Sequence, residues 1–349
     1  MEKYDNIVFI GRFQPLHNGH LNTIKKALLL ANKRVIILVG SVNGPRTFKN
    51  PFTFKQRQKI ICETIKFEDD IKHNWEKSYH VFPIKDHPYN DSVWINSVQE
   101  QVANIIGKNE TVAIIGSHKD KSSRYLDWFP QWGYVSEELD KDSSVIDATA
   151  VRNILFEDLN VGFFKGVLPN ESFNFLQEFK NTAEYSRIRD EYEVIKAYKK
   201  SWESAPYAPT FVCTDAVVLC AGHVLMIERG AQPGKGQWAL PGGFLNPDER
   251  IRACAVRELI EETKIDVPER VLDGSIDKVE VFDHPNRSQR GRTITHAFRI
   301  NVNLTPKGKL PKVKGSDDAA KAKWIPLNEL NEDLIYEDHF SIITSMIGN

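Results

Sequence analysis

The first half of the chain alternates short apolar runs with segments of helical periodicity. Four apolar runs have the length and aliphatic composition of buried strands: residues 7–10, 34–40, 80–84 and 111–116. Three segments between them repeat apolar residues at helical spacing: residues 20–32, 54–65 and 92–106. Because such strands are buried on both faces, this half is predicted to be an α/β domain with a parallel sheet covered by helices.

The second half follows a different pattern. Residues 211–219 and 223–228 are β-like runs separated by Cys220-Ala221-Gly222, which predicts a hairpin. Residues 249–263 carry Ile251, Ala255 and Leu259 on one stripe and therefore predict a helix.

A charged stretch lies between the two halves. Over residues 170–204 apolar positions recur at helical spacing among many charged ones, which predicts one or two amphipathic helices with a solvated outer face. We therefore expect two domains, over residues 1–180 and 206–349, joined by a helical connector over residues 181–205.

Composition narrows the class of protein. The 349 residues leave room for two domains, and a net charge of −1 argues against a nucleic-acid binder. The four cysteines form no C-x-x-C pair, which argues against zinc and against a disulfide scaffold: Cys62, Cys213, Cys220 and Cys254. No signal-peptide pattern and no apolar run of roughly 18 residues is present. We expect a soluble, cytoplasmic protein without a membrane partner.

The strongest local pattern is GRFQPLHNGH, residues 11–20, between the first predicted strand and the first predicted helix. His17 and His20 stand at this strand-to-helix turn, where free backbone N–H groups and the positive end of the helix favour phosphate. Gly19 lets the main chain approach a ligand closely. The turn is therefore a candidate phosphate site.

Polar clusters follow the other predicted strands as well. They are the segments 41–46, 86–90 with Trp94 beyond it, 117–121 with Arg124, and 147–152. In the last of these, Thr149 is predicted to cap a helix from whose first turn Arg152 projects. Since ligands bind beyond the carboxyl ends of parallel strands, these clusters are expected to share one site with the histidines.

The stretch GRFQPLHNGH together with ATAVR (residues 148–152) resembles the nucleotidyltransferase superfamily. With NGPRTFKNPFTFKQR added, residues 5–180 resemble the archaeal-type nicotinamide mononucleotide (NMN) adenylyltransferases, which implies a Rossmann-like domain. One departure is Asp147, where the family more often has Ser or a small residue, and where a carboxylate would repel phosphate.

The resemblance implies transfer of AMP from ATP, as substrate, to NMN, which gives NAD and pyrophosphate. An in-line displacement of this kind requires positioning and charge stabilisation rather than a protein nucleophile. The implied catalytic residues are His17, His20 and Arg152. The implied ATP-binding residues are Gly11, Arg12, Phe13, His17, His20, Ser117, Asp120, Thr149 and Arg152. The implied NMN-binding residues are Arg46, Asp86 and Trp94, with Trp94 stacking on the nicotinamide ring.

Two alternatives remain open for this half. Trp94 has helical spacing with Val98 and Val102 and could be a core residue. Nicotinate mononucleotide could replace NMN as the acceptor. Mg2+ is expected to accompany ATP, bound mainly through the phosphates.

A second chemical pattern, G-x5-E-x7-RELIEE, runs from Gly243 to Glu262. On the predicted helix, Glu258, Glu261 and Glu262 are three and four residues apart and project from one side. Because like charges this close cost stability, they predict a cation, and oxygen ligands favour Mg2+ or Mn2+. The alternative is a solvated acidic face paired with arginines.

This pattern resembles the Nudix box at every defined position but one, since Lys264 stands where the family has Gly. The likeness covers residues 207–345 and implies an α/β/α Nudix domain. It implies that Glu258, Glu261 and Glu262 hold the metal. It also implies that three further box residues shape the site: Gly243, Glu249 and Arg257.

Residues 282–292 look like the loop of ADP-ribose-processing Nudix members, which makes Arg290 and Arg292 candidate ADP-ribose contacts. The loop could instead be an interaction surface. Asp317 and Asp318 are candidates for the general base. The implied reaction is hydrolysis of ADP-ribose to AMP and ribose 5-phosphate.

The sequence therefore predicts a bifunctional enzyme of NAD metabolism whose partners are small nucleotides: ATP, NMN, NAD and ADP-ribose. The alternative for the second domain is a ligand sensor or regulator on a Nudix scaffold. The sequence leaves a homo-oligomer open as the assembly state.

Overall fold

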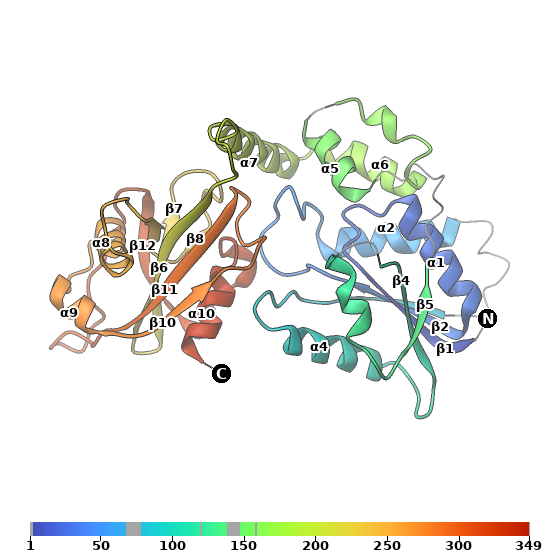
Figure 1. Cartoon of the computed structure of the whole chain (residues 1–349), viewed down its shortest axis with the longest axis horizontal. Helices are drawn as coiled ribbons and strands as arrows, with labels where there is room; N and C mark the ends of the chain where they lie inside the picture. The colour runs from blue at the N-terminus through green and yellow to red at the C-terminus, as the bar shows by residue number, and fades with distance from the viewer. Residues whose placement is uncertain (1–2, 68–77, 119–120, 138–146, 158, 349) are drawn as a thin grey trace. The chain divides into compact units, whose positions relative to one another are not determined.

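The computed structural model describes residues 3–67, 78–118, 121–137, 147–157 and 159–348, with no side-chain description for residues 121, 122 and 161. The chain forms two compact units, Met1–Arg189 and Asp190–Asn349, coloured from blue to green and from olive to red in Figure 1. The division falls inside α7 (Ala183–Lys200), so the second half of this helix belongs to the C-terminal unit. The sequence instead places the boundary near residue 205.

The N-terminal unit is built on a five-stranded sheet in which every ladder is parallel. Its strands are β1 (Tyr4–Gly11), β2 (Ala31–Val39), β3 (Ser78–Pro83), β4 (Val112–Gly116) and β5 (Gly133–Ser136). The first four are the predicted strands. β5 was not predicted, because its four residues are too few and too exposed to form an apolar run.

Helices cover both faces of this sheet. They are α1 (Asn18–Leu30), α2 (Phe54–Phe67) and α4 (Asp91–Ala103), which match the three predicted helical segments. Alternate residues of β1 point to opposite faces, so Ile7 packs with α1 and α2 while Val8 packs with α4. This two-sided burial explains why the strands read as continuous apolar runs.

The strand order β3-β2-β1-β4-β5 reverses direction between β1 and β4. In open α/β sheets the ligand crevice lies beyond the carboxyl ends of the strands at such a switch point. The GRFQPLHNGH stretch begins at the carboxyl end of β1. Further elements among the described residues of the unit are η1 (Lys121–Asp127), α5 (Ala148–Phe156), η2 (Val161–Phe164) and α6 (Asn170–Phe179).

The C-terminal unit is built on a mixed sheet of order β10-β11-β6-β7-β12, with β8 added to β7 and β9 to β6. Its strands are β6 (Thr210–Cys220), β7 (His223–Arg229), β8 (Trp238–Ala239), β9 (Gly242–Phe244), β10 (Ile276–Phe282), β11 (Arg292–Asn301) and β12 (Ala319–Pro326). The predicted hairpin is confirmed, and Ala221 and Gly222 take the positive φ angles, 46° and 74°, of a tight two-residue turn.

Helices lie on both faces of this sheet too (Figure 1). The unit contains α8 (Ile251–Thr263), α9 (Glu269–Gly274), η3 (Leu327–Glu329), η4 (Glu332–Leu334) and α10 (His339–Ile347). α8 packs Ala255 and Leu259 on one face, whereas α10 contacts β10 on the other through Ser345. The predicted helix over residues 249–263 starts two residues later than expected. No helix among the described residues is long and apolar enough to cross a membrane.

Candidate active sites

His17 and His20 form a capping box at the start of α1. The Nδ1 atom of His17 accepts the backbone N–H of His20, and Nδ1 of His20 accepts the backbone N–H of His17, each at 3.4 Å. The two rings stack with their centroids 3.7 Å apart. Because each Nδ1 is an acceptor, the proton of each neutral ring lies on Nε2. The local fold thus presents two Nε2–H donors side by side.

The ring of Phe13 packs against the ring of His20. Its ring is 1% exposed and lies 4.8 Å from the His20 ring, and a Cβ at Gly11 would come within 3.0 Å of it. The Phe13 side chain is therefore a core residue, and only its main chain is left for the predicted nucleotide contact. Gln14 fixes the same loop, since its amide exchanges two hydrogen bonds with the backbone of Phe52.

Arg152 reaches this loop from α5, as the sequence predicts. Its guanidinium donates to the carbonyl of Gln14 at 2.7 Å and to the hydroxyl of Thr149 at 3.1 Å. The helix cap, however, is Asp147, whose carboxylate accepts the N–H of Ala150 at 2.7 Å. The prediction that Thr149 caps the helix is wrong, and Thr149 orients Arg152 instead.

Burial and the nearby positive charge of Arg12 lower the pKa of Arg152 to about 10. The side chain therefore stays charged at neutral pH, and the nearby charge of Asp147 offsets its burial only in part. A buried cation in this condition favours an anionic ligand.

The sequence did not single out Arg57, which organises the edge of the sheet. Its guanidinium is buried and donates to three main-chain carbonyls, those of Arg12, Gly40 and Ser41, at 2.7 to 3.0 Å. Burial lowers its pKa to about 10. The available signal was a charged residue on the stripe of α2 that otherwise buries Ile60, Ile61 and Ile65.

Asp86, which is predicted to bind NMN, lies at the same edge of the sheet as the carbonyls that Arg57 binds. It follows β3, is exposed, and accepts the N–H of Ser41 through its carboxylate at 3.2 Å. Ser117 follows β4 at the same edge. The predicted ATP contact Asp120 lies outside the described residues.

Arg46 and Trp94, the other two residues predicted to bind NMN, contact other parts of the protein. Arg46 donates to the carbonyl of Pro51 at 2.7 Å, and its guanidinium lies 5.4 Å from the centre of the Phe179 ring. Trp94 is half-buried and packs edge-on against two aromatic rings, those of Tyr125 and Trp128, at about 6 Å. These contacts agree with the alternative in which Trp94 is a core residue.

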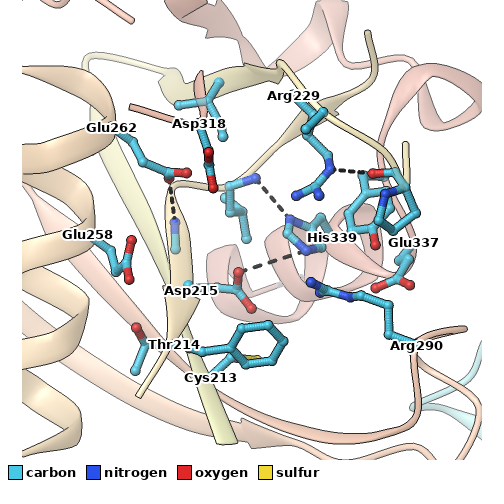
Figure 2. Close-up of a pocket in the computed structure, with 18 of the residues that line it drawn as sticks. Cys213, Thr214, Asp215, Arg229, Glu258, Glu262, Arg290, Asp318, Glu337 and His339 are labelled. Carbon is cyan, nitrogen blue, oxygen red and sulfur yellow. Dashed lines mark hydrogen bonds and ion pairs between the residues drawn. The ribbon is translucent and has the colours of Figure 1, made fainter. Parts of the chain in front are cut away.

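The C-terminal unit contains a cavity of about 470 Å³. Figure 2 shows Glu258 and Glu262 on one side of it, Arg229 and Arg290 on the other, and Asp215 between them. Glu261, the third predicted metal ligand, also lines the cavity, as do Asp317 and Asp318, the candidates for the general base.

Two glycines bring the backbone against the carboxylates. The N–H of Gly242 donates to Glu262 at 2.9 Å, and a Cβ on Gly242 would lie 2.1 Å from the carbonyl oxygen of Thr214. A Cβ on Gly243 would lie 2.4 Å from Oε1 of Glu258. Any side chain at either position would therefore displace the strand or a carboxylate.

Arg257 holds three of the glutamates. It donates to both oxygens of Glu249, at 2.6 and 2.9 Å, and to one oxygen each of Glu258 and Glu261 at 2.9 Å. The hydrogen bonds from the Arg257 guanidinium lower the pKa of Glu249 to about 2. Arg257 therefore fixes the start of the helix and two of the predicted metal ligands together.

Glu262 is in a different environment. It is 5% exposed, and burial together with the nearby charges of Glu258 and Asp318 raises its pKa to about 8. Burial also raises the pKa of Glu258. Such crowded carboxylates fit a divalent cation. As the described residues are placed, no three side chains of metal-binding type converge closely enough to hold one.

The predicted ADP-ribose contacts differ from one another. Arg290 lines the cavity with its guanidinium 4.9 Å from the centre of the Phe244 ring. Arg292 is paired with Asp283, donating to its carbonyl and lying 3.7 Å from its carboxylate, and it does not line the cavity. The prediction for Arg292 is therefore not supported by its position.

The sequence did not point to a buried charged network of which Asp215, Arg287 and His339 line the cavity. Arg287 donates to both oxygens of Asp338 at 2.9 and 3.0 Å and lies 3.7 Å from Asp215. Nε2 of His339 lies 3.8 Å from Asp215, while its Nδ1 accepts the N–H of Leu240 at 2.9 Å. The signal that could have found it is Asp215, a charge inside an otherwise apolar strand.

Comparison with known proteins agrees with this two-part architecture. Residues 8–153 match the Cytidylyltransferase-like family and residues 210–346 match the NUDIX domain family. A Francisella tularensis protein described as a bifunctional NMN adenylyltransferase/ADP ribose pyrophosphatase, crystallised with AMP and a Mn ion, is 36% identical. The alignment covers 99% of this chain and 98% of that one, with a TM-score of 0.89. This chain belongs to the same bifunctional family.

Two further relatives each match one half of this bifunctional family member. A nicotinamide/nicotinic acid mononucleotide adenylyltransferase of Acinetobacter baylyi is 36% identical over 192 residues, which are 55% of this chain and 95% of that protein. An ADP-ribose pyrophosphatase of Methanocaldococcus jannaschii is 34% identical over 137 residues, which are 39% of this chain and 73% of that protein.

Lys264 is the position at which this bifunctional family member departs from the Nudix box. It ends α8 in the left-handed conformation, with φ 43° and ψ 39°, which glycine adopts without strain. We expect Lys264→Gly to stabilise the C-terminal unit by about 1 kcal/mol, or about 2–4 °C in Tm by calorimetry. Lys264→Ala keeps the Cβ and should give no gain. An equal gain in both variants would contradict the conformational explanation.

Proposed function

We propose that the N-terminal unit transfers AMP from ATP to NMN, giving NAD and pyrophosphate. The observation that carries this is the stacked pair His17 and His20 at the helix start, together with the buried cation Arg152, which donates to Gln14 of the same loop. Donors fixed before the reaction stabilise charge that develops on the α-phosphate without having to reorganise. Arg57 and Gln14 hold the loop that carries them.

In this proposal, the charge of Asp86 distinguishes NMN from nicotinate mononucleotide as the acceptor of AMP. Asp86 is exposed at the end of β3, where its carboxylate disfavours the additional carboxylate of nicotinate mononucleotide. We expect kcat/KM to be about tenfold higher for NMN than for nicotinate mononucleotide, a difference of about 1.4 kcal/mol. Steady-state assays with each acceptor measure it. Asp86→Asn should reduce the ratio, and equal kcat/KM values in the unaltered protein would favour a dual acceptor.

We further propose that the C-terminal unit hydrolyses ADP-ribose to AMP and ribose 5-phosphate with Mg2+ or Mn2+. The observation that supports this is that Glu258, Glu261 and Glu262 all line the same cavity. When bound, the ion would activate water and neutralise the diphosphate. Arg257 occupies only one oxygen of Glu258 and one of Glu261, so the second oxygen of each is available to the ion.

Hydrolysis is tested by incubating the purified protein with ADP-ribose in the presence of Mn2+, Mg2+ or a chelator. Formation of AMP and ribose 5-phosphate only with a divalent cation is the expected result. Tight binding of ADP-ribose without cleavage, with either cation, would favour the sensor alternative instead.

A further inference from the structure

One wall of the cavity in the C-terminal unit comes from outside the matched NUDIX domain. Val194, Ile195 and Tyr198 belong to α7, which ends ten residues before that domain begins, yet all three line the cavity. Their spacing, i, i+1 and i+4, places them on one side of the helix. Ile195 is 2% exposed, whereas Val194 is 41% exposed despite its apolar side chain.

This half of α7 is firmly attached to its own unit. The buried carboxylate of Glu191 accepts the N–H of Gly234, in a loop that also lines the cavity, at 3.3 Å. Tyr198 and Trp202 pack against Phe211 of β6, with ring centroids 5.8 and 6.2 Å away. The wall is therefore a built part of the cavity.

The side chains around Tyr198 continue as an aromatic series. Phe211 lies 5.7 Å from Phe244, and the planar guanidinium of Arg290 lies over Phe244. Phe244 is two residues along β9 from Gly242, which contacts Glu262, so about 7 Å separates the two positions. The cavity thus has a carboxylate end, suited to a cation and a diphosphate, and an apolar aromatic end.

We propose that Tyr198, together with Val194 and Ile195, forms the wall that binds the adenine base of the nucleotide substrate. The inference rests on the proposed hydrolase function and deepens it by naming the residues that select the base. A purine presents a flat apolar face, which favours stacking on an aromatic ring or a guanidinium plane. The sugar-phosphate end of the substrate has no such face and suits the carboxylate end.

The test compares two products as inhibitors of ADP-ribose hydrolysis. In Tyr198→Leu, which keeps apolar packing against Phe211 but lacks the ring, we expect the inhibition constant of AMP and the KM of ADP-ribose to rise about tenfold. The inhibition constant of ribose 5-phosphate and kcat should change less than twofold. Tyr198→Phe should restore the original values, and Glu193→Ala, an exposed neighbour on α7, should leave them unchanged.

An increase for ribose 5-phosphate in place of AMP would overturn the assignment, because it would place the terminal ribose on this wall. Unchanged constants for both products would overturn it as well. An unchanged kcat for ADP-ribose hydrolysis reports that the C-terminal unit of each variant is folded.

Hydrogen exchange separates failure of this inference from failure of the proposed function. With AMP and Mn2+ added, amides over residues 190–200 should exchange more slowly in the unaltered protein but not in Tyr198→Leu. Protection without any hydrolysis of ADP-ribose would leave the base wall in place and reject the hydrolase. Hydrolysis without protection would do the reverse.

Discussion

Replacing His20 with alanine is expected to abolish NAD formation and to leave ADP-ribose hydrolysis unchanged. The His20 ring is stacked on His17, and its Nε2–H is fixed because Nδ1 is an acceptor in the capping box. Removal of one preorganised donor to developing charge costs about 10²–10³ in kcat, or roughly 3–4 kcal/mol. The measurement is NAD production from NMN and ATP alongside AMP release from ADP-ribose, on one preparation.

The alanine variant also removes an acceptor for the backbone N–H of His17, which costs helix stability of about 1 kcal/mol. His20→Gln separates the two effects, because glutamine at this position of a capping box can accept the same N–H. We expect His20→Gln to recover the thermal stability but not the activity. His80→Ala, a strand histidine stacked on Phe82, should retain both activities. Recovery of NAD synthesis in His20→Gln would show that His20 acts only on the helix.

The N-terminal fold could be predicted well because short segments of the sequence are enough to identify its elements. Continuous apolar runs identify strands buried on both faces, helical spacing of apolar residues identifies the helices, and GRFQPLHNGH identifies the loop at the end of β1. The helix cap could not be assigned as surely, since Asp147 and Thr149 are both capping residues and only the three-dimensional structure distinguishes them. Arg57 escaped notice because its partners are backbone carbonyls of two separate loops, which leave no mark on the side-chain pattern.

In the C-terminal unit, spacing along α8 placed the glutamates at one cavity edge. It could not show that Arg257 binds three of them, because a fork of this kind depends on rotamers rather than on spacing. Arg290 lies in the loop before β11 and Arg292 is the first residue of that strand, so the sequence does not tell which of the two faces the cavity. The α7 wall could not be found from a charged amphipathic pattern, which gives an apolar face but not the surface it covers.

Glu262→Gln is expected to abolish ADP-ribose hydrolysis and to preserve NAD synthesis. The substitution keeps an oxygen to accept the N–H of Gly242 but removes the charge that the ion requires. Loss of a charged metal ligand should lower kcat by at least about 10²-fold. Glu269→Gln, an exposed position on α9, is the matched control and should retain both activities. Substantial hydrolysis by Glu262→Gln would show that the ion is held by other residues.

In a chelator at high pH, Glu262→Gln should raise the thermal stability of the protein, although the same substitution removes ADP-ribose hydrolysis. Because the pKa of Glu262 in the folded unit is raised from 4.5 to about 8, the folded state binds more protons than the unfolded state between these values. Its contribution to the free energy of unfolding is therefore present below pH 4.5 and is lost as the pH rises through 8. At pH 9 with EDTA, Glu262→Gln should melt a few degrees above the unaltered protein.

Added Mn2+ should raise the Tm of the unaltered protein only, since the ion compensates a carboxylate that the variant lacks. An equal Mn2+ shift in both proteins would contradict the assignment of Glu262 as a ligand.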